Sequence, residues 1–232
     1  MLYNKLLELG TGANAALIVS IVLLAVISYL LGSLNFGIII SNKLYHNDVR
    51  KSGSGNAGST NMLRTYGKRA GALTFVLDCL KTVLCILLGP LFFTTKDTVY
   101  LGMFIAGVSC MVGHSYPVFY KFKGGKGVAC FAMLVAITSC FMNLWYIFVG
   151  LFLLFVVIVA LTKYVSLGSV LCAMLYPVLL NRLNGSDKSV EIVAVLAGLF
   201  VVFQHRKNIA RLLRGEENKL SFSKKSKEGE GK

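Results

Sequence analysis

A glycine-rich polar segment at residues 53–61 combines the residue types that bind a phosphate group. Glycine allows several backbone N–H groups to point at one spot, and hydroxyl and amide side chains add donors. Arg64 follows closely enough for its planar guanidinium to reach the same oxygens. A flexible loop with an orienting arginine is the alternative, but a linker does not need two asparagines and a threonine among its glycines. We therefore predict an anion site formed by Gly53, Ser54, Gly55, Asn56, Gly58, Thr60, Asn61 and Arg64.

A second segment, Gly113 to Gly127, carries a related signal. It is not a nucleotide-binding phosphate loop, because Gly127 stands where a Ser or Thr would bind magnesium. Glycines before a helix nevertheless favour an anion-binding turn at the helix N-terminus, with Lys126 supplying positive charge. A basic loop with a glycine bend is the alternative. The predicted residues are His114, Gly124, Gly125, Lys126 and Gly127, although a lone histidine at a span end more often makes an interfacial hydrogen bond.

Further polar groups follow or interrupt apolar sequence. His205, Asn208 and Arg211 recur every three residues, so a helix continuing past His205 would present them on one face; the alternative is a positive stop after the last span. Asp78 and Lys81 can pair within a span, as a functional or a structural ion pair. Two serines could donate to a ligand or pack helices together; they are Ser166 and Ser169.

Long apolar segments must position these groups. Hydrophobic residues form 56% of the 232-residue chain, and its mean hydropathy is +0.70, above the usual range of soluble domains. The apolar runs approach the roughly 20 residues that a helix needs to cross the hydrocarbon core. We predict an all-α polytopic membrane protein with about seven transmembrane helices at residues 15–41, 70–93, 98–118, 127–142, 144–162, 165–182 and 189–205.

The 24 Lys and Arg residues predict the orientation, because positive residues in short loops stay in the cytoplasm. An outside N-terminus and a cytoplasmic C-terminus place most of them inside. One transmembrane domain is expected at 1–219, followed by a basic, disordered tail at 220–232. The net charge of +14 lies between and after apolar runs, which favours membrane orientation and anionic ligands over nucleic acid.

The six cysteines lie in or beside apolar segments and form no CxxC pair, so they are read as small buried hydrophobic residues. Three histidines well separated in sequence form no recognised metal motif. We predict no metal site and no cofactor.

Three segments, GSGNAGSTN with Arg64, GHSYPVFYKFKGGKGVA and HRKNIARLLRGEEN, resemble the cytoplasmic motifs of the bacterial acyl-phosphate-dependent glycerol-3-phosphate acyltransferase family. Their order and spacing match across nearly the whole chain. Ala57, Ser59 and Cys130 vary family positions without removing a phosphate ligand. The resemblance implies seven spans, an external N-terminus and an active site at the cytoplasmic face of the bacterial inner membrane.

The resemblance also implies transfer of a fatty acyl group from acyl phosphate to the 1-hydroxyl of glycerol 3-phosphate, the first acylation step of phospholipid synthesis. The products are lysophosphatidic acid and phosphate. A mixed anhydride has a good leaving group, so positioning and charge stabilisation suffice without a covalent acyl-enzyme. On this basis, phosphate binding and transition-state stabilisation are assigned to Ser54, Arg64, Lys126 and Asn208, and orientation of the acceptor to His205. Either His205 or a substrate phosphate oxygen takes the hydroxyl proton.

One motif is absent. Acyltransferases that use thioester donors carry a His-x4-Asp dyad, but the residues five beyond His46, His114 and His205 are Lys51, Phe119 and Ala210. Direct use of acyl-CoA or acyl-carrier thioesters is therefore not expected. Two other classes stay open: a carrier or channel for a phosphorylated small molecule, and a noncatalytic subunit that binds a partner or anionic lipid through its basic face.

Overall fold

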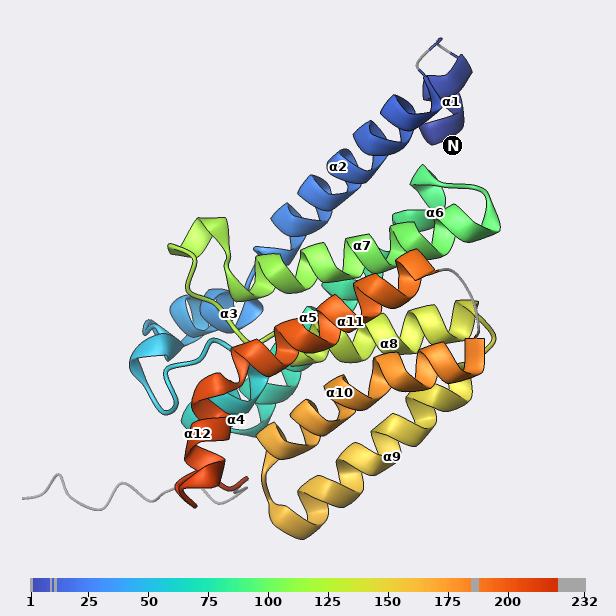
Figure 1. Cartoon of the computed structure of the whole chain (residues 1–232). Helices are drawn as coiled ribbons and strands as arrows, with labels where there is room; N and C mark the ends of the chain where they lie inside the picture. Colours follow the sequence, from blue (N-terminus) through green and yellow to red (C-terminus); the bar gives the residue numbers. More distant parts are fainter. Residues whose placement is uncertain (1, 9, 11, 185–187, 221–232) are drawn as a thin grey trace, which may run out of the picture.

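The computed structural model describes residues 2–8, 10, 12–184 and 188–220, and the described chain is helical throughout apart from its connections (Figure 1). The α-helices are α1 (Leu2–Glu8), α2 (Ala13–Gly32), α3 (Phe36–Tyr45), α4 (Ser59–Tyr66), α5 (Lys68–Leu87), α6 (Gly89–Phe92), α7 (Lys96–Ser115), α8 (Val128–Phe141), α9 (Trp145–Thr162), α10 (Val165–Asn184), α11 (Lys188–Gln204) and α12 (Arg206–Leu213). Two short 3₁₀ turns are η1 (Val49–Lys51) and η2 (Val118–Tyr120).

Five helical segments within the described residues are long and apolar enough to cross a membrane: Ala13–Tyr45, Lys68–Phe92, Thr98–Tyr120, Trp145–Thr162 and Val165–Leu183. A sixth is obtained when α11 and α12 are taken as one segment bent by 57°. The fourth predicted span, at 127–142, holds α8, whose 14 residues extend only about 21 Å at 1.5 Å per residue. The predicted all-α polytopic architecture is confirmed, but the described residues hold five candidate spans, or six with the bent pair, rather than about seven, because α8 is short.

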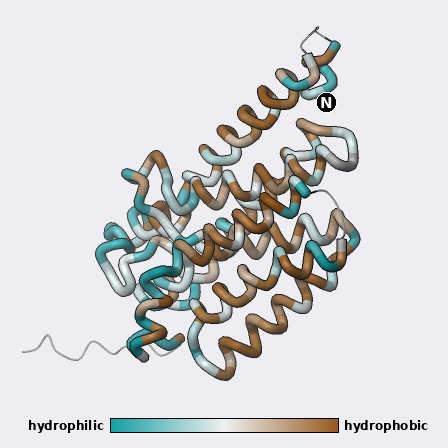
Figure 2. Tube along the Cα trace, in the orientation of Figure 1, coloured by the Kyte–Doolittle hydropathy of each residue, from teal (hydrophilic) through white to brown (hydrophobic). Residues whose placement is uncertain are grey.

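Apolar residues follow one another along most of the long helices (Figure 2). A buried cluster contributed by α5, α7, α8, α9, α10 and α11 includes Phe104, Leu134 and Tyr176. Large apolar side chains also point outward, as at Leu84 and Phe152. Because water would penalise such a surface and lipid does not, the outward-facing side chains are those of a membrane-embedded bundle.

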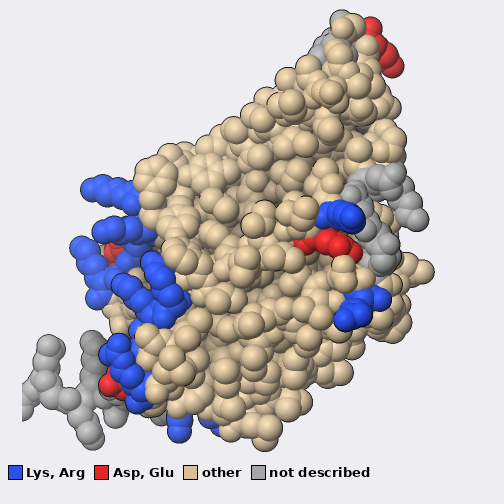
Figure 3. Space-filling view, in the orientation of Figure 1, with Lys and Arg blue, Asp and Glu red and all other residues tan. Residues whose placement is uncertain are grey.

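The polar segments gather at one end of the bundle (Figure 2), around the helices labelled α3, α4 and α12 in Figure 1. Lys and Arg side chains crowd the same end in the space-filling view, while few charges lie on the apolar flank (Figure 3). Segments far apart in the sequence are therefore neighbours in space. The predicted tail at 220–232 lies outside the described residues except for Leu220.

The first predicted span is broken where α2 ends and α3 begins. The Lys81 ammonium donates to the carbonyl oxygens of Gly32 and Leu34 at 3.1 and 2.8 Å. Asn35 caps α3 by accepting from the Ile38 amide at 3.2 Å, and it donates to the His114 carbonyl at 3.2 Å. Lys81 of α5 thus satisfies two backbone carbonyls that a continuous helix would have paired itself, and Asn35 joins the break to α7.

Candidate active site

All three polar motifs line one cavity of about 250 Å³ at the polar end of the bundle. Thirteen predicted site residues line it: Ser54, Asn56, Gly58, Thr60, Asn61, Arg64, His114, Lys126, Gly127, Ser166, Ser169, His205 and Asn208. Four others are not among its lining residues: Gly53, Gly55, Gly124 and Gly125. The structure therefore brings together the segments that the sequence singled out.

Two helices begin at the cavity wall. Helix α4 starts at Ser59, and Gly58, Ser59 and Thr60 line the cavity. Helix α8 starts at Val128 after Gly127, whose backbone is left-handed at φ 76°, and Val128 also lines the cavity. The first N–H groups of a helix have no partner within it and carry partial positive charge. Two helix N-termini suited to binding an anion therefore meet in one cavity, which the cations Arg64 and Lys126 also line.

The Asn61 side chain holds the first loop together rather than pointing its amide at a ligand. Its Nδ2 donates to the carbonyls of Val49, Ser52 and Asn56 at 3.0, 3.0 and 2.9 Å. Its Oδ1 accepts from the Ser54 amide at 2.9 Å. Gly53 at φ 58° packs against that oxygen, and a Cβ there would overlap it. We revise the predicted roles accordingly: Asn61 and Gly53 shape the loop that presents Ser54 and Asn56.

The two glycines of the second motif pair with α7 rather than forming an anion turn. The Gly124 and Gly125 amides donate to the Ser115 and His114 carbonyls, each at 3.0 Å. A Cβ on Gly125 would overlap Nε2 of His114. The predicted anion turn is therefore corrected: its free donors are the Lys126 ammonium and the start of α8, because the Gly124 and Gly125 amides are already bonded.

Lys126 and the third motif meet in a hydrogen-bonded network. The Lys126 ammonium donates to Asn208 Oδ1 at 2.6 Å, and Asn208 Nδ2 donates to Glu217 Oε1 at 2.6 Å. Ser166 donates to the same carboxylate oxygen at 3.0 Å, and Arg211 donates to Oε2 at 2.8 Å. Glu217 was missed by the sequence reasoning, although a carboxylate six residues after a motif arginine was the available signal.

Burial and neighbouring charges shift the pKa values of these groups. Burial, together with the cations Arg211 and Arg64, lowers the pKa of Lys126 to about 8 against the attraction of Glu217. Burial also lowers the pKa of Arg64. Burial opposes ionisation of Glu217, but hydrogen bonds from Asn208, Arg211 and Ser166 lower its pKa below the ordinary value. The cavity is thus a partly dehydrated, net cationic space that an anion would stabilise.

His205 marks a bend and not the middle of a continuing helix. The chain turns by 57° between α11 and α12, and His205 precedes the first residue of α12. The predicted shared helical face of His205 and Asn208 is therefore corrected, although both side chains still line the cavity. His205 Nδ1 lies 2.8 Å from the Val201 carbonyl, which can only accept. The proton is on Nδ1, so neutral His205 keeps Nε2 as an acceptor.

Asp78 and Lys81 form an ion pair, and the His114 side chain lies against it. Lys81 Nζ lies 2.7 Å from Asp78 Oδ1 and 3.1 Å from His114 Nδ1, and all three side chains are buried. Because an ammonium only donates, His114 Nδ1 accepts. Asp78 and His114 line the cavity, while Lys81 bonds the α2–α3 break. The ion pair thus links the cavity, through Asp78, to the break between α2 and α3, through Lys81.

The cavity also has an apolar side. Phe75 of α5, Val128 of α8, Phe155 of α9 and Val165 of α10 also line it. Phe75 is exposed on the outer surface of the bundle. One cavity therefore offers anion-binding groups and contact with the lipid-facing surface, as a molecule with a charged head and an apolar tail requires. Within the described residues, no three His, Cys, Asp or Glu side chains could hold a metal ion.

Comparison with known proteins gives one consistent family. A family profile described as glycerol-3-phosphate acyltransferase matches residues 22–215. The glycerol-3-phosphate acyltransferase of Thermoanaerobacter sp. (strain X514) is 41% identical over 199 residues, covering 86% of this chain and 95% of its own. That of Finegoldia magna is 39% identical over 204 residues, covering 86% and 96%.

Two solved structures share the fold. The chain resembles crystal structures of PlsY (YgiH), an integral membrane glycerol 3-phosphate acyltransferase, in its glycerol 3-phosphate and lysophosphatidic acid forms. The first has a TM-score of 0.77 at 36% identity, covering 87% of this chain and 96% of that one. The second has a TM-score of 0.75 at 35% identity, covering 88% and 96%.

Proposed function

The chain belongs to the glycerol-3-phosphate acyltransferase family and is a multi-pass membrane enzyme that converts glycerol 3-phosphate to lysophosphatidic acid, and from this we propose that its acyl donor is an acyl phosphate bound in the cavity described above. One observation carries the donor assignment. The starts of α4 and α8 face a single cavity that the cations Arg64 and Lys126 also line. Two phosphate groups must be held at once if donor and acceptor each carry one.

Glycerol 3-phosphate and lysophosphatidic acid are the ligands named for the solved relatives, and we propose that they bind here in the same cavity. We assign the start of α8, Lys126 and Asn208 to one phosphate and the start of α4, Ser54 and Arg64 to the other. Ser166 and Ser169 line the same cavity. This division is supported by the chain positions of the two cations, since Arg64 belongs to α4 and Lys126 comes just before α8.

The reaction then needs no covalent intermediate on the enzyme. The 1-hydroxyl of glycerol 3-phosphate attacks the acyl carbon, the bond to the phosphate oxygen breaks, and phosphate leaves. Positive charge at the two helix ends and at Arg64 and Lys126 stabilises the developing oxyanion and the departing phosphate. Acceptance of the hydroxyl proton is assigned to Nε2 of His205 or to an oxygen of the phosphate itself.

The acyl chain is assigned to the apolar side of the cavity. Phe75 and Phe155 line it, and Phe75 reaches the lipid-facing surface of α5. A chain that stays among apolar side chains and lipid avoids exposure to water, which would cost about 0.8 kcal/mol per methylene group. The bilayer is therefore the proposed route by which the acyl phosphate enters and the product leaves.

We also propose that the site faces the cytoplasm. The polar end with its clustered Lys and Arg residues is the end that the positive-inside rule assigns to the cytoplasm (Figure 3). The N-terminus is then outside. Labelling of single cysteines placed at Lys51 and at Asn4, in a variant lacking accessible native thiols, tests this with a membrane-impermeant reagent on intact cells. Labelling at Asn4 alone is expected, and labelling at Lys51 would contradict it.

The donor test uses the purified protein with radiolabelled glycerol 3-phosphate. We expect lysophosphatidic acid from a long-chain acyl phosphate and none from the matching acyl-CoA, with a Lys126→Ala variant as the inactive control. Equal rates with both donors would contradict the assignment. Uptake of unchanged glycerol 3-phosphate into vesicles without conversion would instead indicate a carrier.

A further inference from the structure

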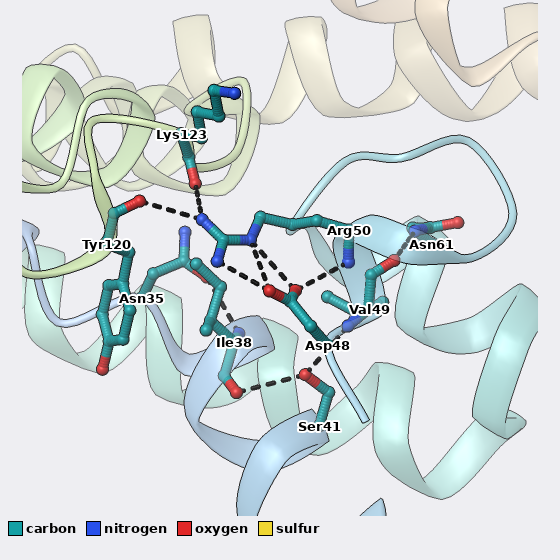
Figure 4. A network of polar contacts seen from close by, with 9 residues as sticks. All are labelled: Asn35, Ile38, Ser41, Asp48, Val49, Arg50, Asn61, Tyr120 and Lys123. Atoms are coloured by element: carbon teal, nitrogen blue, oxygen red, sulfur yellow. Dashed lines mark hydrogen bonds and ion pairs between the residues drawn. The ribbon is translucent and has the colours of Figure 1, made fainter. Parts of the chain in front are cut away.

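Asp48 and Arg50 form a salt bridge that is outside the cavity and close to both glycine-rich loops (Figure 4). Asp48 Oδ1 caps η1 by accepting from the Arg50 amide at 2.9 Å. The guanidinium donates from Nε to both carboxylate oxygens at 3.0 Å and from Nη2 to Oδ2 at 2.7 Å. These hydrogen bonds from Arg50 lower the pKa of Asp48, which keeps its carboxylate ionised. The side chain of Arg50 is therefore held in one direction.

The remaining guanidinium nitrogen reaches the second loop. Arg50 Nη1 donates to the carbonyls of Tyr120 at 2.9 Å and Lys123 at 2.8 Å. Between these two carbonyls lie Lys121 and Phe122, both in the left-handed backbone region at φ 57° and 56°. Such conformations are costly for residues with a side chain and persist where surrounding contacts enforce them. Arg50 bonds the backbone on both sides of this strained turn.

The two ends of this connection lead directly to the two anion sites. On one side, Asn61 bonds the Val49 carbonyl and also the Ser54 amide. On the other side, Lys123 is followed by Gly124 and Gly125, whose amides are bonded to α7, and then by Lys126. A single guanidinium thus joins the loop that leads to α4 with the loop that leads to α8.

We propose that Arg50 is a positioning residue that sets the placement of the Ser54 loop relative to Lys126, and thereby the separation of the two bound phosphates. The assignment rests on the proposed two-phosphate site. Each anion site keeps its own ligands without Arg50, so each substrate still binds. What depends on Arg50 is the alignment of the acceptor hydroxyl with the acyl carbon, and small misalignments at this stage cost up to about 100-fold in rate.

Lysine cannot replace arginine here. The Arg50 guanidinium contacts one carboxylate and two carbonyls at the same time through three nitrogens in a plane. A lysine ammonium keeps the charge but is a single point donor without this fixed fork. Arg50→Lys therefore removes the connection between the loops while leaving the net charge of the polar face unchanged.

The experiment compares four purified full-length variants with the wild type: Arg50→Lys, Lys51→Ala, the pair Lys121→Gly and Phe122→Gly, and this glycine pair combined with Arg50→Lys. Lys51 is the exposed neighbour of Arg50 and serves as the matched control. Steady-state kinetics give kcat and both KM values, and calorimetric titration with glycerol 3-phosphate gives the fraction of protein that binds it. Glycine adopts the left-handed backbone conformation without steric cost. The two glycines should therefore keep the turn in its conformation in part even without the Arg50 hydrogen bonds.

For Arg50→Lys we expect kcat to fall between about 10-fold and 100-fold, with binding stoichiometry unchanged and both KM values within about threefold. Lys51→Ala should stay within about twofold of the wild type. The glycine pair should restore at least about a third of the lost kcat, and in the wild-type background it should change kcat by less than about twofold. These results together would establish positioning through the turn.

Three outcomes would overturn the proposal: wild-type kcat in Arg50→Lys, a loss of binding stoichiometry that matches the loss of kcat, or no recovery with the glycine pair. The second outcome would indicate a role in folding only. If the wild-type enzyme does not use acyl phosphate, the proposed donor is wrong. This result comes from the activity of the wild type and does not depend on any Arg50 variant. The two failures are therefore distinguishable.

Discussion

The Lys126 ammonium donates to the side-chain oxygen of Asn208 at 2.6 Å, although the two residues are 82 positions apart in the sequence. Asn208 is in turn oriented by Glu217, which accepts from its amide at 2.6 Å. The second and third motifs therefore meet in one hydrogen bond at the cavity wall. A bound phosphate brings a stronger acceptor for the ammonium than a neutral amide oxygen, which makes this contact the place where ligand binding and protonation are coupled.

The pH dependence of catalysis should report Lys126. Its pKa is about 8 in the ligand-free protein, so the ammonium is charged below that pH. A bound phosphate favours the charged form and raises the pKa, so binding above pH 8 requires proton uptake and becomes weaker. We expect kcat/KM for glycerol 3-phosphate to fall above about pH 8, measured from about pH 7 to about pH 10.

Lys126→Arg is the control for this titration, because arginine stays charged over the whole range. The decline should move to higher pH in the variant, even where the altered shape lowers the overall rate. An unchanged alkaline decline would assign the titration to another group.

Replacing Arg64 should affect catalysis far more than folding. Arg64 lines the cavity and donates to the Asn218 carbonyl at 3.2 Å. Loss of a preorganised cationic donor costs about 100-fold or more in kcat. We expect that loss in Arg64→Ala, with the helical circular dichroism of the wild type. Arg69→Ala, which removes an exposed arginine at the start of α5, should stay within about twofold. Similar losses in the two variants would indicate a general charge effect.

Glu217 should matter chiefly for stability. Its carboxylate accepts from Ser166, Asn208 and Arg211, and it is only 9% exposed. Glu217→Ala leaves these donors without their acceptor, which costs about 2 kcal/mol or more. We expect a clear fall in Tm of the detergent-purified protein. The adjacent Glu216 is exposed, so Glu216→Ala serves as the control and should leave Tm nearly unchanged. Equal Tm values for both variants would exclude this role.

The buried Asp78–Lys81 pair should behave as a coupled unit. The two charged atoms are 2.7 Å apart, and the side chains are 2% and 5% exposed. Lys81→Met leaves a buried carboxylate without its cation and should cost about 3 to 5 kcal/mol. Adding Asp78→Asn removes the uncompensated charge, so the double variant should be more stable than Lys81→Met alone. Thermal unfolding of both variants measures this, and additive losses would show that the two residues are independent.

Much of the fold could be predicted because hydropathy is a local property of the chain. Apolar runs such as 70–93 and 144–162 must leave water, and helices that bond their own backbone are the form they can take in lipid. The glycine-rich and basic segments were equally visible, since charge and glycine content are read directly from the residues. These features led to the membrane architecture and to the cavity-lining residues Ser54, Arg64, Lys126, His205 and Asn208.

Hydrogen-bond partners were decided only by the tertiary structure. The sequence did not show that the Asn61 side-chain amide donates to carbonyls of its own loop, or that the Gly124 and Gly125 amides donate to carbonyls of α7. It also did not show that the Glu217 carboxylate accepts from three donors. It also left open the break at Asn35 and the bend at His205. Each of these features depends on which polar groups the folded chain brings within hydrogen-bonding distance of one another. A polar atom buried away from water needs a hydrogen-bond partner, and the packing of the helices determines which partner it has.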